Sequence, residues 1–177
     1  MKKLYSIAIC PPIYIIEQIR DMKNLLATKI KWYHSKNAAA HITFHNLLLD
    51  ENELVILESF INNFCRTIYP FALSFTGFGS FPNGAFFLSP DEISSQILVE
   101  VMKKFLNDIS LNVKQDSIVP HISIGRNLNP DQLAIAKELF SDQKVDINFL
   151  CEGLSIRRFN EQIKQYEIYK HFAFTKD

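Results

Sequence analysis

The order of apolar and polar positions divides the chain into predicted strands and helices. A short apolar run at 4–10 stops at two prolines and predicts a first strand, followed by a helix with apolar residues at helical spacing: Ile15, Ile19, Met22 and Leu26. Residues 40–48 predict a second strand. Asp50 and Glu53 then form a capping box for a helix whose apolar face carries Leu54, Leu57, Ile61, Phe64 and Ile68. Alternation at 71–75 predicts a third strand, which ends near Gly77 and Gly79.

The same order of elements begins again near residue 85. Residues 85–88 predict a strand, and the segment 89–92 predicts a helix start with Pro90 in the first helical position, followed by a buried stripe: Ile93, Ile97, Val101 and Phe105. Residues 121–128 predict a strand, 129–132 cap a further helix, and 147–151 alternate up to Gly153. Landmarks therefore recur at offsets of 78, 80 and 76: Pro12 and Pro90, His41 and His121, Gly77 and Gly153. These offsets indicate an internal duplication.

The duplication predicts an α+β fold of two β-α-β-α-β units, with antiparallel sheets facing a central groove and a pseudo-two-fold axis between the units. We expect the first repeat at about 1–80, the second at about 84–160, and a closing strand at about 163–174. The connection at 80–84 is too short for the units to move independently. The sequence therefore predicts a single bilobal domain over residues 1–177.

Composition and charge narrow the classes of partner. The 19 basic and 19 acidic residues give a formal net charge of zero, which excludes binding of an extended nucleic acid by charge alone. No apolar run reaches the ~18–20 residues that cross a bilayer, so we expect a soluble protein without a membrane partner. Three widely spaced cysteines, Cys10, Cys65 and Cys151, predict neither disulfides nor a thiolate zinc site and suit a reducing cytoplasm.

Two matching motifs carry the candidate chemistry. His41-Ile42-Thr43 and His121-Ile122-Ser123 each place an imidazole and a hydroxyl on one face of a strand, because residues i and i+2 project to the same side. The pseudo-two-fold axis would bring both pairs around one anion-sized space. A displacement at phosphorus needs a base, an acid and donors for the non-bridging oxygens, which two histidines and two hydroxyls provide without a metal. We therefore predict catalysis by His41 and His121 on a phosphodiester.

This arrangement resembles the 2H phosphoesterase superfamily, in particular its branch of 2′-5′ RNA ligase-like and cyclic phosphodiesterase proteins. The resemblance covers nearly the whole chain and rests on the two motifs, their spacing, the opening Ile-Ala-Ile-Cys-Pro-Pro and the proline before His121. It implies a bilobal α+β hydrolase that acts on 2′,3′-cyclic phosphates or 2′-5′ linkages of nucleotides or RNA ends, without metal or other cofactor. It also implies His41 as the acid, His121 as the base, and Thr43 and Ser123 as phosphate ligands.

The resemblance extends the site to one further residue. Arg126 lies five positions after His121, where relatives often carry a basic residue near the phosphate, and a solvated strand end is the alternative for it. Asn46 occupies the matching position in the first repeat, so charge assistance would come from one side only. Serine at position 123 replaces the commoner threonine and keeps the hydroxyl.

Several alternatives remain open at this point. His45 shares a face with His41 if the strand is regular, although a peripheral position is the preferred interpretation. A helical reading would make the same two histidines zinc ligands, but the glutamate of that motif is missing. Nucleobases could stack on aromatic groove walls: Phe78, Phe81 or Tyr169. Of two consecutive arginines, 157 and 158, only one can face the groove.

A non-catalytic module for binding a nucleotide or RNA end is the second functional hypothesis, although a binder would not need a pair of proton-transfer groups. In either case we expect a monomer whose partner is a nucleotide or a short RNA terminus. The sequence leaves open the physiological substrate, the base preference, and hydrolysis against ligation.

Overall fold

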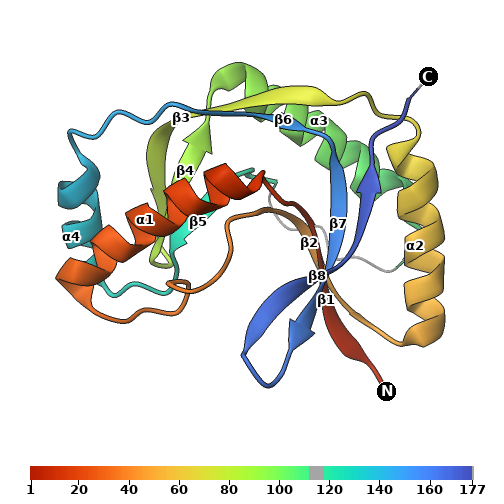
Figure 1. Cartoon of the computed structure of the whole chain (residues 1–177), viewed down its shortest axis with the longest axis horizontal. Helices are drawn as coiled ribbons and strands as arrows, with labels where there is room; N and C mark the ends of the chain where they lie inside the picture. The colour runs from red at the N-terminus through yellow and green to blue at the C-terminus, as the bar shows by residue number, and fades with distance from the viewer. Residues whose placement is uncertain (112–117, 177) are drawn as a thin grey trace.

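The computed structural model describes residues 1–111 and 118–176 (Figure 1). Its elements follow in chain order: β1 (Lys3–Ile9), α1 (Ile13–Ile30), β2 (Ile42–Leu49), α2 (Glu51–Cys65), β3 (Phe71–Phe81), β4 (Ala85–Pro90), α3 (Glu92–Asp108), β5 (Ile122–Gly125), α4 (Pro130–Phe140), β6 (Ile147–Cys151), β7 (Gly153–Asn160) and β8 (Gln165–Ala173). The predicted order of strands and helices is confirmed, together with the α+β class.

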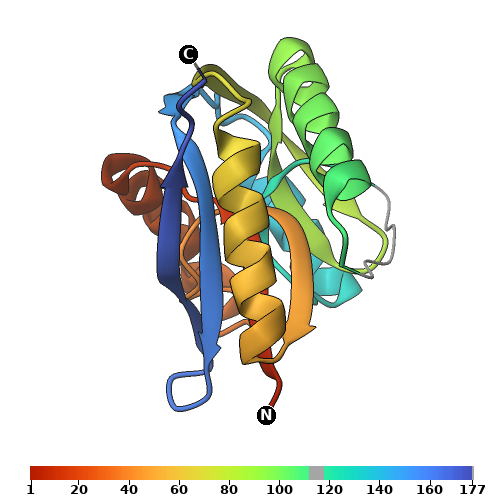
Figure 2. The same ribbon diagram turned by 90° about the vertical axis from the view of Figure 1, so that its right-hand side faces the viewer.

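One curled antiparallel sheet contains the strands of both repeats, in the order β6-β3-β4-β5-β2-β1-β7-β8. Its two halves, β6-β3-β4-β5 and β2-β1-β7-β8, meet where β5 pairs with β2. Helices α1 and α4 pack together at one end of the molecule and contact β5 and β4, respectively. Helices α2 and α3 lie at the other end, where α2 covers β2, β7 and β8, and α3 covers β3 and β4 (Figures 1 and 2).

The pairing of the strands follows the predicted pseudo-two-fold axis. Ile42 pairs with Ile122, and Leu73 pairs with Phe149, at the same offsets of 80 and 76 that the sequence repeat shows. The repeats also exchange strands, since β3 of the first pairs with β4 and β6 of the second, while β7 pairs with β1. Each half of the sheet is therefore built from both repeats.

Side-chain caps fix where three helices begin. Asp50 and Glu53 form the predicted capping box of α2, and Asn129 and Gln132 form a second one at α4. The predicted start of α3 is two residues too early: Pro90 ends β4, Glu92 is the first helical residue, and Asp91 is the N-cap, accepting a hydrogen bond from the amide of Ser94 at 2.7 Å. The Asp91 carboxylate accepts a hydrogen bond from an amide of the first helical turn that has no partner within the helix. A proline at the N-cap has no side-chain acceptor for that bond.

The strand predicted at 121–128 ends earlier, at Gly125. Asn127 has a φ of 54°, which a strand residue does not adopt, and the amide of Leu128 donates to the carbonyl of Gly84 at 3.0 Å. Arg126 therefore sits on a loop that is fastened to the β3–β4 turn. The turn depends on Gly84, whose φ is 82° and whose missing Cβ would lie 2.1 Å from the carbonyl oxygen of Leu128.

Replacement of Gly84 by alanine should lower the free energy of unfolding by at least about 2 kcal/mol, because the backbone is left-handed and the added methyl group overlaps main-chain atoms. Urea unfolding of the variant measures this loss. Gly77→Ala is the matched control, since a Cβ there meets no atom within 4 Å. Equal stability of the two variants would contradict the tight contact at residue 84.

The core is apolar and continuous across both halves of the sheet. Fully buried side chains include Ile7, Ile42, Phe75, Phe105 and Phe140. Across the described ranges, 1–111 and 118–176, no helix combines the length and the apolar character needed to span a membrane.

Candidate active site

The two histidine motifs lie side by side at the seam between the halves of the sheet. Because Ile42 pairs with Ile122 in antiparallel register, the flanking residues place His41 beside Ser123 and Thr43 beside His121. Ile42 and Ile122 are fully buried, whereas the histidines and hydroxyl residues are half-buried on the opposite face. In this register His41 and His121 are diagonal neighbours, whose backbones lie about 7–8 Å apart. This spacing leaves room for a phosphorus atom between the two imidazoles.

Matching hydrogen bonds hold the two imidazoles. Nδ1 of His41 lies 2.7 Å from the carbonyl oxygen of Ala39, and Nδ1 of His121 lies 2.7 Å from that of Val119. A carbonyl oxygen can only accept, so each Nδ1 carries the hydrogen and each Nε2 is the nitrogen left to exchange a proton. The same two-residue loop geometry in both repeats thus fixes the same tautomer twice.

A β-bulge decides which polar residue follows Thr43 along the wall of the site. In the pairing of β1 with β2, Ala8 faces Thr43 and Ile7 faces His45, so that Phe44 is an extra residue in β2. The alternative in which His45 shares the face of His41 is therefore wrong, whereas the preferred peripheral position agrees with the bulge, and Asn46 lines the cavity instead. Since β2 is a strand, the helical zinc reading of His41 and His45 is wrong as well.

A cavity of about 360 Å³ opens beside His41 and Thr43. Arg126 and Asn46, the two residues five positions after the histidines, both line it, as does Arg157. The remaining lining residues come from β1, the 31–41 loop, the β5–α4 loop and the β7–β8 hairpin: Ser6, His34, Ser35, Ala38, Asn127, Phe159, Lys164, Gln165 and Tyr166. His121 and Ser123 do not line this cavity, so it extends from the first motif, away from the second.

Lys23 ties the loop before His41 to helix α1. Its side chain is only 2% exposed and donates hydrogen bonds to the carbonyl oxygens of Ala38 at 2.7 Å and Ser35 at 3.3 Å. Tyr33 donates to the carbonyl oxygen of Lys23, and Ser35 donates to that of Ile124 in β5. These bonds hold the segment that supplies the Ala39 carbonyl to His41.

Burial and positive charge keep His41 neutral in the ligand-free protein. Burial lowers the pKa of His41 from 6.5 to about 3, and Arg157, Lys23 and Arg126 add to the shift, whereas the bond to Ala39 opposes it. Burial also lowers the pKa of His121; the Val119 carbonyl opposes that shift, and Arg126 adds to it. The pKa of Lys23 falls to about 8, again mainly through burial and then through the two arginines.

The shifted pKa of His41 predicts a loss of stability in mild acid. In the unfolded chain the imidazole titrates near 6.5, so between pH 6.5 and 3 the unfolded state binds more protons and stability falls as the pH falls. At pH 5 this contribution is about 2 kcal/mol. Urea unfolding at pH 7 and pH 5 should show a smaller loss for His41→Gln than for the wild type. The same loss in both proteins would contradict a neutral His41 imidazole in the folded protein.

Aromatic rings surround His121. The ring of Phe87 lies 4.8 Å from the imidazole and that of Phe81 lies 5.5 Å away, edge to face. Among the aromatic residues considered for the groove wall, Phe81 is thus beside the site. Phe78 instead packs on Phe86 and Phe140, and Tyr169 packs on Tyr5 and beneath Arg158.

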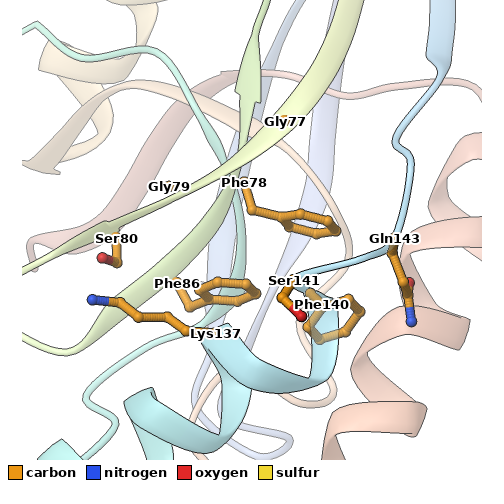
Figure 3. Close-up of a pocket in the computed structure, with 9 residues that line it drawn as sticks. All are labelled: Gly77, Phe78, Gly79, Ser80, Phe86, Lys137, Phe140, Ser141 and Gln143. Carbon is orange, nitrogen blue, oxygen red and sulfur yellow. The ribbon is translucent and has the colours of Figure 1, made fainter.

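A second cavity of about 360 Å³ lies against β3 and α4 (Figure 3). The aromatic rings of Phe78, Phe86 and Phe140 gather there, with Lys137 beside them. It contains none of the predicted site residues. In the part of the chain that the structure describes, no three residues among His, Cys, Asp and Glu are grouped to hold a metal ion.

Sequence reasoning missed the buried cation Lys23 and left open which of two arginines, 157 or 158, faces the groove. The buried stripe of α1 passes through Ile19, Lys23 and Leu26, and the predicted Met22 is half-buried against the same core. A lysine within a buried stripe was therefore the available signal. Arg157 is the arginine of the pair that faces the groove, while Arg158 is outside it. Only the register of β7 against β1 decides between them.

Comparisons with known proteins agree with this fold. A family model described as the 2′-5′ RNA ligase superfamily matches residues 9–162. No curated protein matches the chain. Among solved structures, the protein TT0787 of Thermus thermophilus has a TM-score of 0.69 at 15% identity and covers 100% of both chains. LigT of E. coli complexed with 3′-AMP has a TM-score of 0.71 at 13% identity and covers 99% of this chain and 100% of its own.

A structure described only as a phosphoesterase is also similar, with a TM-score of 0.66 at 14% identity and coverage of 99% of this chain and 100% of its own. At these identities the solved structures establish the fold, and the match of the family model over most of the chain establishes the family. This chain belongs to the 2′-5′ RNA ligase superfamily.

Proposed function

We propose that the protein is a metal-independent phosphoesterase that hydrolyses 2′,3′-cyclic phosphates of nucleotides or short RNA ends by two-histidine acid–base catalysis. The observation that carries the proposal is the matched pair of imidazoles, each held by Nδ1 through a carbonyl two residues earlier and each beside the hydroxyl of the other motif. The E. coli LigT structures described as complexes with 3′-AMP and with phosphate support ligands of this class.

In the proposed reaction, one neutral imidazole takes a proton from water as the water oxygen attacks phosphorus. The other imidazole, in its protonated form, donates a proton to the leaving ribose oxygen as its bond to phosphorus breaks. Thr43, Ser123 and Arg126 stabilise the charge on the non-bridging oxygens. The product is a 2′- or 3′-monophosphate, and the histidines regain their starting states by proton exchange with solvent.

The charged residues around the two imidazoles influence which histidine acts as the acid and which acts as the base. Arg157, Lys23 and Arg126 all lower the pKa of His41, whereas Arg126 alone among these three lowers that of His121. This asymmetry favours His41 as the base and His121 as the acid in the ligand-free protein, the reverse of the roles that the family resemblance implies. A bound anion offsets the three cations and raises the pKa of His41, so the substrate itself influences the assignment.

The proposal is tested with a panel of phosphodiesters at constant enzyme concentration: 2′,3′-cyclic mononucleotides, a short RNA with a cyclic phosphate end, and a 2′-5′-linked dinucleotide. We expect turnover of the cyclic phosphates to a single monophosphate isomer, which identifies the leaving oxygen. Turnover of the dinucleotide alone would show that the protein cleaves 2′-5′ linkages and not cyclic phosphates. Tight binding of all three without product would support the non-catalytic module.

We further propose that the protein works as a monomer in the cytoplasm, with a nucleotide or short RNA terminus as its partner. The zero net charge and the position of Arg126 and Arg157 at one cavity support a short ligand.

A further inference from the structure

Arg157 is a buried cation in the row of polar side chains beside the first motif. It lies in β7 opposite Ser6 of β1, and Ser6 in turn lies opposite Asn46 of β2, so the three side chains form one row on the cavity side of the sheet. Arg157 is only 3% exposed, and its Nη1 has no hydrogen-bond partner among the described residues. Its guanidinium carbon lies 5.5 Å from the ring centre of Tyr166. A buried guanidinium with an unpaired N–H is costly unless a ligand completes it.

The surroundings of Arg157 are positive. Arg126 lines the same cavity, as does Lys164, whose ammonium group pairs with Glu161 at 2.7 Å, and none of the described residues that line the cavity is acidic. Lys23 lies close enough for Arg157 to lower its pKa, and its ammonium group is engaged by two carbonyl oxygens of the loop. A cavity with cations and no carboxylate attracts an anion, and the fork of an arginine suits a phosphate.

Arg157 is displaced from the pair of motifs. Strand β1 separates β7 from β2, so the backbone of Arg157 is about 10 Å from that of Asn46, which follows the first motif in β2. The small side chain of Ser6 between them leaves the floor of the cavity open, and Phe159, Gln165 and Tyr166 of the β7–β8 hairpin form its outer wall. A volume of about 360 Å³ falls in the range of small-molecule sites and accepts more than one phosphate.

We propose that the cavity beside His41 is a second phosphate subsite, in which Arg157 binds the 5′-phosphate of the nucleotide whose 2′,3′-phosphate is cleaved. This inference rests on the proposed function. It narrows the substrate class to 5′-phosphorylated nucleotides and RNA 3′ ends, in which the terminal nucleotide carries a 5′-phosphodiester. A nucleoside 2′,3′-cyclic phosphate without that group is then turned over with a higher KM.

The test compares adenosine 2′,3′-cyclic phosphate with its 5′-phosphorylated form, in the wild type, in Arg157→Gln and in Arg158→Gln. Arg158 is the matched control, since it is the next residue of the same strand and lies outside the cavity. We expect a KM at least 10-fold lower for the 5′-phosphorylated substrate in the wild type and in Arg158→Gln. In Arg157→Gln that difference should disappear, with kcat changed less than 3-fold. Thermal melting checks that each variant is folded.

Equal KM values for both substrates in the wild type would overturn the subsite. A similar drop of kcat on both substrates in Arg157→Gln would overturn it as well, because Arg157 would then serve the phosphate that is cleaved. Calorimetric binding of 3′-AMP and adenosine 3′,5′-bisphosphate separates this inference from the proposed function. At least 10-fold tighter binding of the bisphosphate, lost in Arg157→Gln, supports the subsite even without turnover, and equal affinities overturn it.

Discussion

Replacing either His41 or His121 by alanine should reduce kcat/KM for a 2′,3′-cyclic nucleotide by about 10²–10⁴-fold, the usual contribution of a positioned acid or base. Both rings are expected to act in the same displacement, on opposite sides of one phosphorus atom. The loss should therefore appear in kcat, with KM little changed. Steady-state kinetics of the two variants, made under identical conditions, measures it.

His171→Ala is the control for this prediction. His171 is exposed in β8 and bonds to Ser155 through Nδ1 at 3.0 Å, away from both motifs. We expect its activity to stay within a few-fold of the wild type. If either His41→Ala or His121→Ala kept wild-type kcat while remaining folded, the two-histidine mechanism would be wrong.

A substrate whose leaving group needs no proton distinguishes the histidine that acts as the acid from the histidine that acts as the base. With a nitrophenyl phosphodiester, the variant that lacks the acid should recover much of its rate, whereas the variant that lacks the base should not. The charges around His41 predict that His121→Ala is the variant that recovers. Recovery of His41→Ala instead would support the roles that the family resemblance implies.

Removal of the hydroxyl groups is the second large effect that we expect. Thr43→Val and Ser123→Ala should each lower kcat by about 10²–10³-fold, because a donor that meets developing charge on a phosphoryl oxygen stabilises the transition state more than the ground state. Each hydroxyl lies beside the histidine of the other motif, as the pairing of Ile42 with Ile122 requires. Thr43→Ser keeps the hydroxyl and should retain most of the activity.

Thr76→Val is the matched control for the loss of a hydroxyl in a strand. Thr76 is exposed in β3 and belongs to neither the His41 cavity nor the motifs. A loss in Thr43→Val that appears only in KM, with kcat intact, would make this hydroxyl a ground-state binding group and would contradict its proposed role in the transition state.

The fold was predictable from the sequence because its signals are local and occur twice. The capping boxes at Asp50 and Asn129 mark helix starts, and the recurring offsets give the pseudo-two-fold axis that brings β2 beside β5. The faces of the two motifs followed from strand alternation alone, since Ile42 and Ile122 are buried and their neighbours are not.

Other features depend on pairings between distant strands, which local patterns do not encode. The bulge at Phe44 moves His45 off the active face and brings Asn46 onto it, and it is visible only in the register of β2 against β1. The exchange of β3 and β7 between the repeats is equally non-local. The position of Arg157 in the cavity beside His41 follows from that exchange, because β7 lies on β1.

The central claim is tested most directly by incubating the wild-type protein with a 5′-phosphorylated 2′,3′-cyclic nucleotide in the presence and absence of EDTA. The account predicts hydrolysis to a single monophosphate isomer at the same rate in both conditions, and loss of that rate in His41→Ala and His121→Ala. Activity that disappears with EDTA and returns with added metal would contradict the metal-free mechanism. Absence of product from folded protein, with the nucleotide bound, would contradict catalysis itself.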